Sequence, residues 1–281
     1  MKKKKSRSVP IYIIILAVLF IVVAGYSFIA PFIYQIDLSD IDLRSRMLPP
    51  DIFGGNSGHL LGTDHMGRDI FIRLWYAIRT SLSITFVGLI TSLLLGTALG
   101  VLGGMCGGWV DDIIVFLVNV RISIPPILIG IVVATVFGTG STVLLVLTTL
   151  IYWTGFTRIV RSEIMRIRTE NFIECSRSIG ASSTRILFEH IIPNIASPLI
   201  VTTTLNISGI LLFESSMSYL GLGVVPPDTS LGLMISTGRD QMISSPWLVL
   251  WPIIAVSIVM MSISLIGDWV RDKLDPKMRG R

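Results

Sequence analysis

Uncharged apolar segments recur along the chain and alternate with shorter stretches that carry the charged residues. A helix needs roughly 20 apolar residues to cross the hydrocarbon core of a bilayer, with some variation allowed by tilt. We therefore predict an all-α integral membrane protein with six transmembrane helices. The expected spans are residues 11–34, 82–106, 113–138, 143–157, 191–213 and 243–267.

The third and fourth spans come from one run, because residues 122–157 contain no charged side chain and are too long for a single crossing. The glycine-rich stretch at 138–142 divides this run. Pro125 and Pro126 lie inside the third span, and proline lacks a backbone N–H and restricts the residue before it, so we predict a break there. Arg121 is then expected near the cytoplasmic end, where it can snorkel toward water.

Lysine and arginine predict the orientation, because they are enriched in cytoplasmic loops. Sixteen of them fall in the N-terminal tail, the 158–190 loop and the C-terminal tail, against six in two outer segments. With six spans both termini lie on one side, so we expect both termini and the 158–190 loop in the cytoplasm. The turn at 107–112 departs from this rule, since it carries two aspartates and no lysine or arginine.

The composition supports the membrane class, since 52% of residues are hydrophobic and only 15% are charged, against about 25% in soluble domains. The net charge of +5 lies beside apolar spans, which favours an anionic leaflet over nucleic acid. We expect neither a disulfide nor a zinc site from Cys106 and Cys175, and Cys175 is interpreted as a small residue in a packed helix. The basic N-terminus resembles a secretory signal cleaved after Ala24, but its apolar run continues to Tyr34, so we expect a retained anchor.

A polar stretch at 170–194 separates the fourth and fifth spans and predicts two short helices around a glycine. Gly180 suits the left-handed residue that ends a helix, and Ser182 or Ser183 can cap the next one. Phe172, Ser176 and Ile179 share a stripe of the first helix. Ile186, Leu187, His190 and Ile191 supply the apolar side of the second, and Pro193-Asn194 is expected to turn the chain into the fifth span. Such a helix suits docking in a partner's groove or lying on lipid headgroups.

This stretch resembles the EAA loop of ABC importer permeases through Glu174-Cys175-Ser176, Gly180 and Ile192-Pro193. Cysteine and serine replace the two alanines of that motif, and both are small. In that family the loop forms a cytoplasmic coupling helix that seats in a cleft of the ATPase subunit. The resemblance therefore implies ATPase coupling by Glu174, Cys175, Ser176, Gly180, Ala181, Ser182, His190 and Pro193.

Segments 59–82, 219–235 and 266–276 are similar to the dipeptide, oligopeptide and nickel "C-type" permease subunits, so the resemblance extends over nearly the whole chain. It implies the type I ABC importer permease fold, with the coupling helix between spans four and five. Leu231 departs from the family, which usually has tryptophan there, and this is expected to weaken an outer-face contact. The implied outer signature or gate consists of Gly62, Thr63, Asp64, Gly67, Arg68 and Asp69.

The resemblance also implies an assembly in the membrane of a bacterial or archaeal cell. The expected partners are a second homologous permease, two ABC ATPase subunits, an extracytoplasmic substrate-binding protein and the lipid bilayer, with no nucleic acid. No nucleotide-binding Gly-x4-Gly-Lys-[Ser/Thr] motif occurs in the chain, so we expect no cofactor here, with ATP and Mg²⁺ bound by the ATPases. The expected substrates are di- or oligopeptides, with nickel or a metal chelate as the alternative.

Glycines at four-residue spacing in the second span predict close helix packing, either within this chain or with a partner. They are Gly96, Gly100, Gly104 and Gly108. His59, Asp64 and His65 carry nickel-compatible donor types, but we interpret this region as hydrogen-bonded structure, with Asp64, Arg68 and Asp69 in a charge network. Glu214 is expected near the outer interface, in contact with water or an outer-loop partner. Asn206 is deeper, where it can bond a neighbouring helix or line the pathway.

The expected organisation is a tail and first helix (1–34), an extracytoplasmic segment (35–79) and a permease core (80–281) with its coupling loop at 158–194. An ion-gradient transporter is a rival class, but it would require ionisable residues inside the membrane or inverted repeats. Beyond Arg121 and Glu214 the expected spans are uncharged. A membrane-embedded enzyme is a third class, for which no metal-helix motif or nucleophile set is found. We therefore predict a transporter subunit and not an enzyme.

Overall fold

The computed structural model describes residues 10–35, 37–38 and 40–274, and this part of the chain is built almost wholly from helices joined by loops. Most of the positive charge predicted for the two tails, including Lys2, Lys5, Lys277 and Arg279, lies outside the described residues. The α-helices are α1 (Ile11–Ile33), α2 (Ile70–Cys106), α3 (Gly108–Ser123), α4 (Pro126–Phe137), α5 (Ser141–Arg168), α6 (Asn171–Ser178), α7 (Ser183–Ile186), α8 (Ile192–Tyr219), α9 (Leu231–Gly238) and α10 (Trp247–Leu274).

Five helical stretches among the described residues are long and apolar enough to cross a membrane. They are α1, α2, α5, the stretch Ser183–Tyr219 that ends with α8, and α10. The pair α3 and α4 makes a sixth span if its two helices are counted together, although they are bent by 90°. The break falls at the predicted prolines, because Ile124 is extended, Pro125 precedes the helix and Pro126 is its first residue.

Two helices begin earlier than their apolar segments. Helix α2 begins at Ile70 instead of residue 82, because Asp69 caps it by accepting a hydrogen bond from the Ile72 N–H at 3.1 Å. Helix α3 begins at Gly108 instead of residue 113. Arg121 therefore lies at the far end of α3, roughly 20 Å from its start at 1.5 Å per residue, and not near the beginning of the span that α3 and α4 form. The side of the membrane that this beginning faces stays a prediction.

The glycines of α2 lie against α5 within this chain. A side chain at Gly96 would meet the Trp153 carbonyl and Phe156, and one at Gly104 would meet Ile164. Gly100 lies equally close to Val160. Small residues let two backbones approach, which strengthens van der Waals contact where lipid offers no hydrophobic driving force. Gly108 does not belong to this ladder, because α2 ends at Cys106 and Gly108 starts α3 with open space around it.

The expected turn at Pro193-Asn194 is wrong, because the helix is continuous from Ser183 to Tyr219. A π-helical turn, Leu187–Ile191, joins α7 to α8, and Pro193 occupies the first turn of α8. A π turn changes the backbone hydrogen-bond pattern next to proline, which has no N–H to donate. The Asn194 side chain donates to the His190 carbonyl at 2.7 Å and adds a bond at this position.

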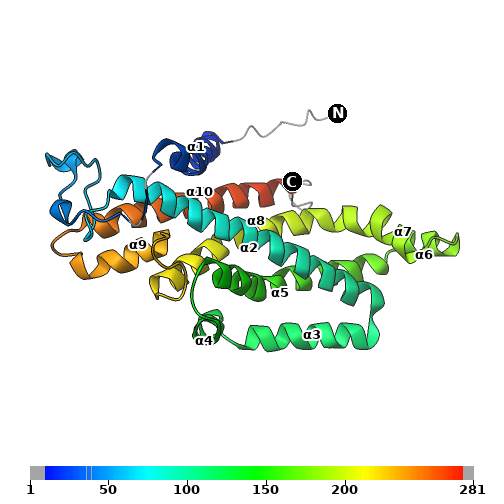
Figure 1. The fold of residues 1–281 in the computed structure, drawn as a ribbon. Coiled ribbons are helices and arrows are strands. Elements are labelled where there is room, and N and C mark those ends of the chain that lie inside the picture. The colour runs from blue at the N-terminus through cyan, green and yellow to red at the C-terminus, as the bar shows by residue number, and fades with distance from the viewer. Residues whose placement is uncertain (1–9, 36, 39, 275–281) are drawn as a thin grey trace.

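The helices form an elongated bundle with different structures at its two ends (Figure 1). Helices α6 and α7 project from one end, which we call the α6 end. Residues 40–69 and α9 gather at the opposite end, which we call the loop end. Helix α1 lies along α2 and α10 and exposes much of its apolar surface, as expected for a helix that faces lipid.

Candidate functional sites at the two ends of the bundle

Helix α6 is attached to the bundle mainly through one buried side chain. Ile173 is fully buried in a cluster with Val160, Ile164, Ile186 and Ile191, which come from α5, α7 and the π turn. The predicted stripe through Phe172 and Ile179 is not the packed side, because both side chains are exposed. Sequence periodicity missed Ile173 because α6 has only two turns, so several faces fit the same pattern.

The surface of the α6 end exposes three large apolar side chains among polar ones. Ile179 is 86% exposed, Phe188 66% and Phe172 44%. Glu174 and Cys175 are also exposed, so the interpretation of Cys175 as a packed residue is wrong for this subunit. A small group of exposed apolar side chains around an acid, presented on a projecting helix, is a surface suited to a protein partner.

The turn after α6 has the conformation that the sequence predicts. Gly180 has φ +86°, in the left-handed region. The Ala181 N–H donates to the Ser176 carbonyl at 3.0 Å and the Gly180 N–H donates to the Arg177 carbonyl at 2.9 Å, which is the Schellman pattern of hydrogen bonds. Ser182 then caps α7 by accepting from the Arg185 N–H at 3.3 Å. These bonds fix the angle between α6 and α7.

His190 links the two short helices. Its Nε2 lies 3.3 Å from the Ser176 hydroxyl, and its ring meets Phe172 edge to face at 5.9 Å. Arg185 donates to Glu189 at 2.9 Å on the same surface. A cavity of about 300 Å³ lies at this surface, and it is lined by Ser176, Ile179, Gly180, Ala181, Arg185, Glu189 and His190. Four of the predicted coupling positions, Ser176, Gly180, Ala181 and His190, therefore meet at one cavity, while Pro193 lies in α8.

Two arginines brace the α6 end, and sequence analysis assigned them no role beyond charge. Arg168 donates to the carbonyls of Gly104 and Met105 at 2.6 and 3.0 Å, which satisfies the C-terminal end of α2. Arg161 forms a two-pronged ion pair with Asp111 of α3, with its Nη2 at 2.6 Å from Oδ2. These contacts connect the end of α5, which leads into α6, to α2 and α3.

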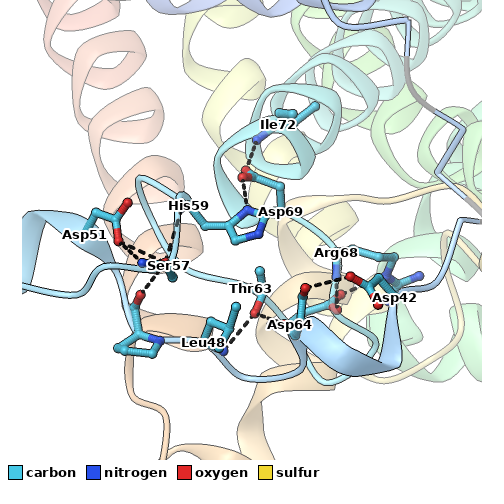
Figure 2. Close-up of polar contacts among 12 residues, drawn as sticks. Asp42, Leu48, Asp51, Ser57, His59, Thr63, Asp64, Arg68, Asp69 and Ile72 are labelled. Atoms are coloured by element: carbon cyan, nitrogen blue, oxygen red, sulfur yellow. Dashed lines mark hydrogen bonds and ion pairs between the residues drawn. The ribbon is translucent and has the colours of Figure 1, made fainter.

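Asp64 organises the loop end (Figure 2). Its carboxylate accepts from the Arg68 guanidinium at 2.8 Å and from Arg73 at 2.5 Å, and also from the N–H groups of Met66 and Arg68. Burial alone would raise the pKa of Asp64, but the Arg73 guanidinium and the Arg68 N–H hold it below its ordinary value. Arg73 reaches on to the Thr229 hydroxyl at 3.4 Å. The network keeps Asp64 ionised and ties the loop to α2.

Arg73 is the main functional residue that sequence reasoning missed at this end. An arginine with a side chain only 9% exposed, three residues into a helix, is a buried charge that needs a partner. The partner is Asp64, nine residues away. Asp69 was expected in the same network, but it bonds His59 Nδ1 at 2.8 Å and caps α2 instead.

Thr63 and two glycines complete the loop end. The Thr63 hydroxyl donates to the Ser45 carbonyl at 2.5 Å and accepts from the Leu48 N–H at 2.8 Å (Figure 2). Gly62 and Gly67 both have φ near +80°, and a side chain on either would collide with loop backbone. All six predicted signature positions therefore lie in one compact loop. Among the described residues no group of three histidine, cysteine or acidic side chains could hold a metal ion.

Glu214 is fully buried, so of the two expected contacts the one with water is wrong. It accepts from the hydroxyls of Ser218 at 3.0 Å and Ser215 at 3.2 Å. Ser230, which lies in the loop between α8 and α9 and caps α9, also hydrogen-bonds to it, as does Ser81 of α2, so the expected partner from this loop is found. Helix α8 continues to Tyr219, six residues past the expected end, which places Glu214 inside the packed bundle. Leu231, the position that departs from the family, is likewise buried.

Comparison with known proteins agrees with this architecture. Residues 92–280 match the family model described as "Binding-protein-dependent transport system inner membrane component". The oligopeptide transport system permease protein OppC of Bacillus subtilis is 32% identical over 99% of this chain and 89% of its own length. The nickel transport system permease protein NikC of Escherichia coli is 35% identical over 96% of this chain and 95% of its own length.

A solved structure supports the fold. The inward-facing MetNI methionine ABC transporter superimposes with a TM-score of 0.57 at 20% identity, covering 72% of this chain and 97% of its own. The chain therefore has the fold of a type I ABC importer permease. It belongs to the family of binding-protein-dependent transport system inner membrane components. It is a multi-pass cell-membrane protein and a permease subunit of such a transporter.

Proposed function

We propose that this chain is one of two permease subunits of an ATP-driven importer of di- or oligopeptides. Its partners are a second homologous permease, two ATPases that bind ATP and Mg²⁺, and an extracytoplasmic binding protein. The named relatives that transport oligopeptides and dipeptides support the substrate class. The positive charge of the tails and of the 158–190 loop supports cytoplasmic termini and a cytoplasmic α6 end.

The observation that carries the proposal is the construction of α6. One buried isoleucine and a Schellman turn hold the helix in place, while Phe172, Ile179 and Phe188 are exposed beyond it. We infer that α6 is the coupling helix and that it seats in a cleft of an ATPase. ATP-driven closure of the ATPases then moves α6, and Arg168 and Arg161 pass that movement to α2 and α3. The permease pair thereby shifts between its two access states.

Substitution of Glu174 tests the docking step. In the assembled transporter, Glu174→Lys is expected to reduce co-purification of the ATPase roughly tenfold, because a reversed charge at a docked surface is repulsive. Asp228→Lys, an exposed acid between α8 and α9 at the loop end, serves as the matched control and should leave ATPase recovery unchanged. Equal recovery with both variants would contradict α6 as the docking helix.

Substitution of Gly180 tests the transmission step. Proline cannot adopt φ +86°, so Gly180→Pro is expected to reorient α6 and abolish ATP-driven uptake while the chain still inserts in the membrane. Uptake into proteoliposomes and membrane content by blotting measure the two properties. If ATP-driven uptake survives in this variant, α6 does not transmit the movement of the ATPases. If uptake survives in a transporter whose ATPases cannot hydrolyse ATP, an ion-gradient mechanism replaces the proposal.

Nickel or a nickel chelate is the second candidate substrate, because the nickel permease is 35% identical over nearly the whole chain. Calorimetric titration of the transporter's binding protein with dipeptides and with Ni²⁺ separates the two. Micromolar or tighter binding of a dipeptide, with no heat from Ni²⁺, is expected. The reverse result would assign the transporter to nickel.

A further inference from the structure

A cavity of about 650 Å³ opens between α3, α5 and α8, on the half of the bundle nearer the α6 end. This volume lies in the range of small-molecule sites, about 300–1,000 Å³. Its polar lining residues include Asn119 of α3, Arg158 of α5 and Asn206 of α8, and none of the described residues that line it is acidic. Arg161 also lines the cavity, but Asp111 neutralises it.

Helix periodicity extends this polar surface one turn deeper. Helices α3 and α8 run away from the α6 end and α5 runs toward it (Figure 1). Val118 and Gly155 line the cavity. Arg121 lies three residues after Val118 in α3, and Tyr152 lies three residues before Gly155 in α5. Residues three apart share a helix face, so Arg121 and Tyr152 lie on the same faces as these lining residues. Tyr152 lies next to Gly209, three residues beyond Asn206, and close to Arg121.

Arg121 forms no ion pair with any of the described residues. Its side chain is partly buried, and its Nε is buried without a hydrogen-bond partner among the described residues. An ionisable side chain inside a membrane span marks a functional path. Arg121 is therefore available to pair with an anionic group that comes from outside this part of the chain.

We propose that this cavity binds the carboxylate of the transported substrate, with Arg158 on its wall and Arg121 one helical turn beyond Val118 of that wall as the cationic contacts. Guanidinium groups bind carboxylates through two parallel hydrogen bonds. Asn119 and Asn206 lie on facing walls and can pair with the amide groups of a short peptide. A peptide C-terminus and a carboxylate-bearing metal chelate share this chemistry. The inference rests on the proposed function and adds to it a carboxylate-selective step inside the membrane.

Protection from thiol labelling tests the site directly. In the assembled transporter with Cys106→Ser and Cys175→Ser, a reporter Thr202→Cys on the cavity wall is labelled with a maleimide. An alanyl-phenylalanine dipeptide with a free carboxylate should slow labelling, and its C-terminal amide should not. Arg121→Gln is expected to raise the dipeptide concentration needed for half protection roughly tenfold, the loss of one charge-assisted hydrogen bond. Arg121→Lys should recover part of this effect, and Arg158→Gln should shift protection in the same direction.

Arg239→Gln is the matched control, because Arg239 is an exposed arginine at the loop end. Equal protection by the acid and the amide, or protection that Arg121→Gln leaves unchanged, would overturn the inference. Slowing of labelling by phosphatidylglycerol instead of peptide would assign the cavity to lipid. Loss of the second permease from the Arg121→Gln complex, with protection intact, would assign it to the subunit interface.

ATP-driven uptake by the unsubstituted transporter distinguishes a failure of the carboxylate site from a failure of the proposed function. If the dipeptide accumulates with ATP while acid and amide protect equally, this inference alone fails. If a nickel–citrate complex protects through Arg121 and the dipeptide does not, the site is retained and the peptide assignment fails. If neither substrate is taken up with ATP, the proposed function fails first.

Discussion

The two ends of this bundle are stabilised in opposite ways. At the loop end, Asp64 bonds two guanidinium groups and two backbone N–H groups, and Thr63 is bonded on both sides. At the α6 end, one buried side chain, Ile173, anchors a helix of two turns whose other apolar residues are exposed. The polar groups of the loop end are paired within the chain, whereas the α6 end leaves large apolar side chains exposed, as expected for the proposed ATPase interface. Substitutions in the loop end should therefore change the stability of the chain, whereas substitutions of exposed residues at the α6 end should change ATPase binding.

Asp64→Ala should have the largest effect on stability. It leaves Arg73 and Arg68 buried without their partner, and breaking a buried ion pair typically costs about 3–5 kcal/mol. Thermal unfolding of the chain in detergent measures this loss. Asp240→Ala removes the exposed pair with Arg239, for which little or no change in stability is expected because solvent screens it. Similar shifts for both variants would show that the loop network is not a stabilising element.

Ile173→Ala should come second, at about 2–4 kcal/mol for a buried isoleucine. The loss is local, so hydrogen exchange should rise in residues 170–186 and not in the loop end. Ile179→Ala is the contrasting change, because that side chain is 86% exposed. We expect it to leave exchange unchanged and to weaken ATPase recovery. If Ile179→Ala raised hydrogen exchange and Ile173→Ala weakened only ATPase recovery, the packed and docking faces of α6 would be the reverse of those proposed.

Gly180→Ala should cost about 1–2 kcal/mol, because a left-handed conformation is strained for any residue with a Cβ. No atom lies within 4 Å of the added methyl group, so the penalty is conformational and not steric. The effect should appear as faster exchange of the Ala181 and Gly180 amides. Gly25→Ala is the control, since Gly25 has equal space inside α1 without a positive φ, and it should be neutral or slightly stabilising.

Acid should act mainly on the loop end, with the smallest effect of the four. The pKa of Asp64 is below its ordinary value, so its stabilisation is fully present above the unfolded pKa, about 3.9. It is lost as the pH falls through the lower folded value. Unfolding midpoints of the unsubstituted chain and Asp64→Asn should therefore converge below about pH 4. A constant difference down to strongly acidic pH would exclude Asp64 as the titrating group.

The sequence by itself determined the membrane class, the approximate position of each span, the break at Pro125-Pro126 and the glycine turn at Gly180. These features depend on local physics: apolar length, the missing proline N–H and the left-handed conformation open to glycine. The resemblance of the 170–194 stretch to permease coupling loops also led to the correct family. Span ends were less accurate, because Arg73 and Glu214 are buried charges that look like boundaries in a hydropathy pattern.

Only the tertiary structure decided which polar residues meet. Asp64 pairs with Arg73, Glu214 is enclosed by serines from α2, α8 and the loop between α8 and α9, and Arg121 is partly buried close to Tyr152. It also decided that Ile173, and not Phe172 or Ile179, anchors α6. Each of these outcomes depends on contacts between segments far apart in the chain. Periodicity along one helix cannot specify them, because it describes a face without saying what that face packs against.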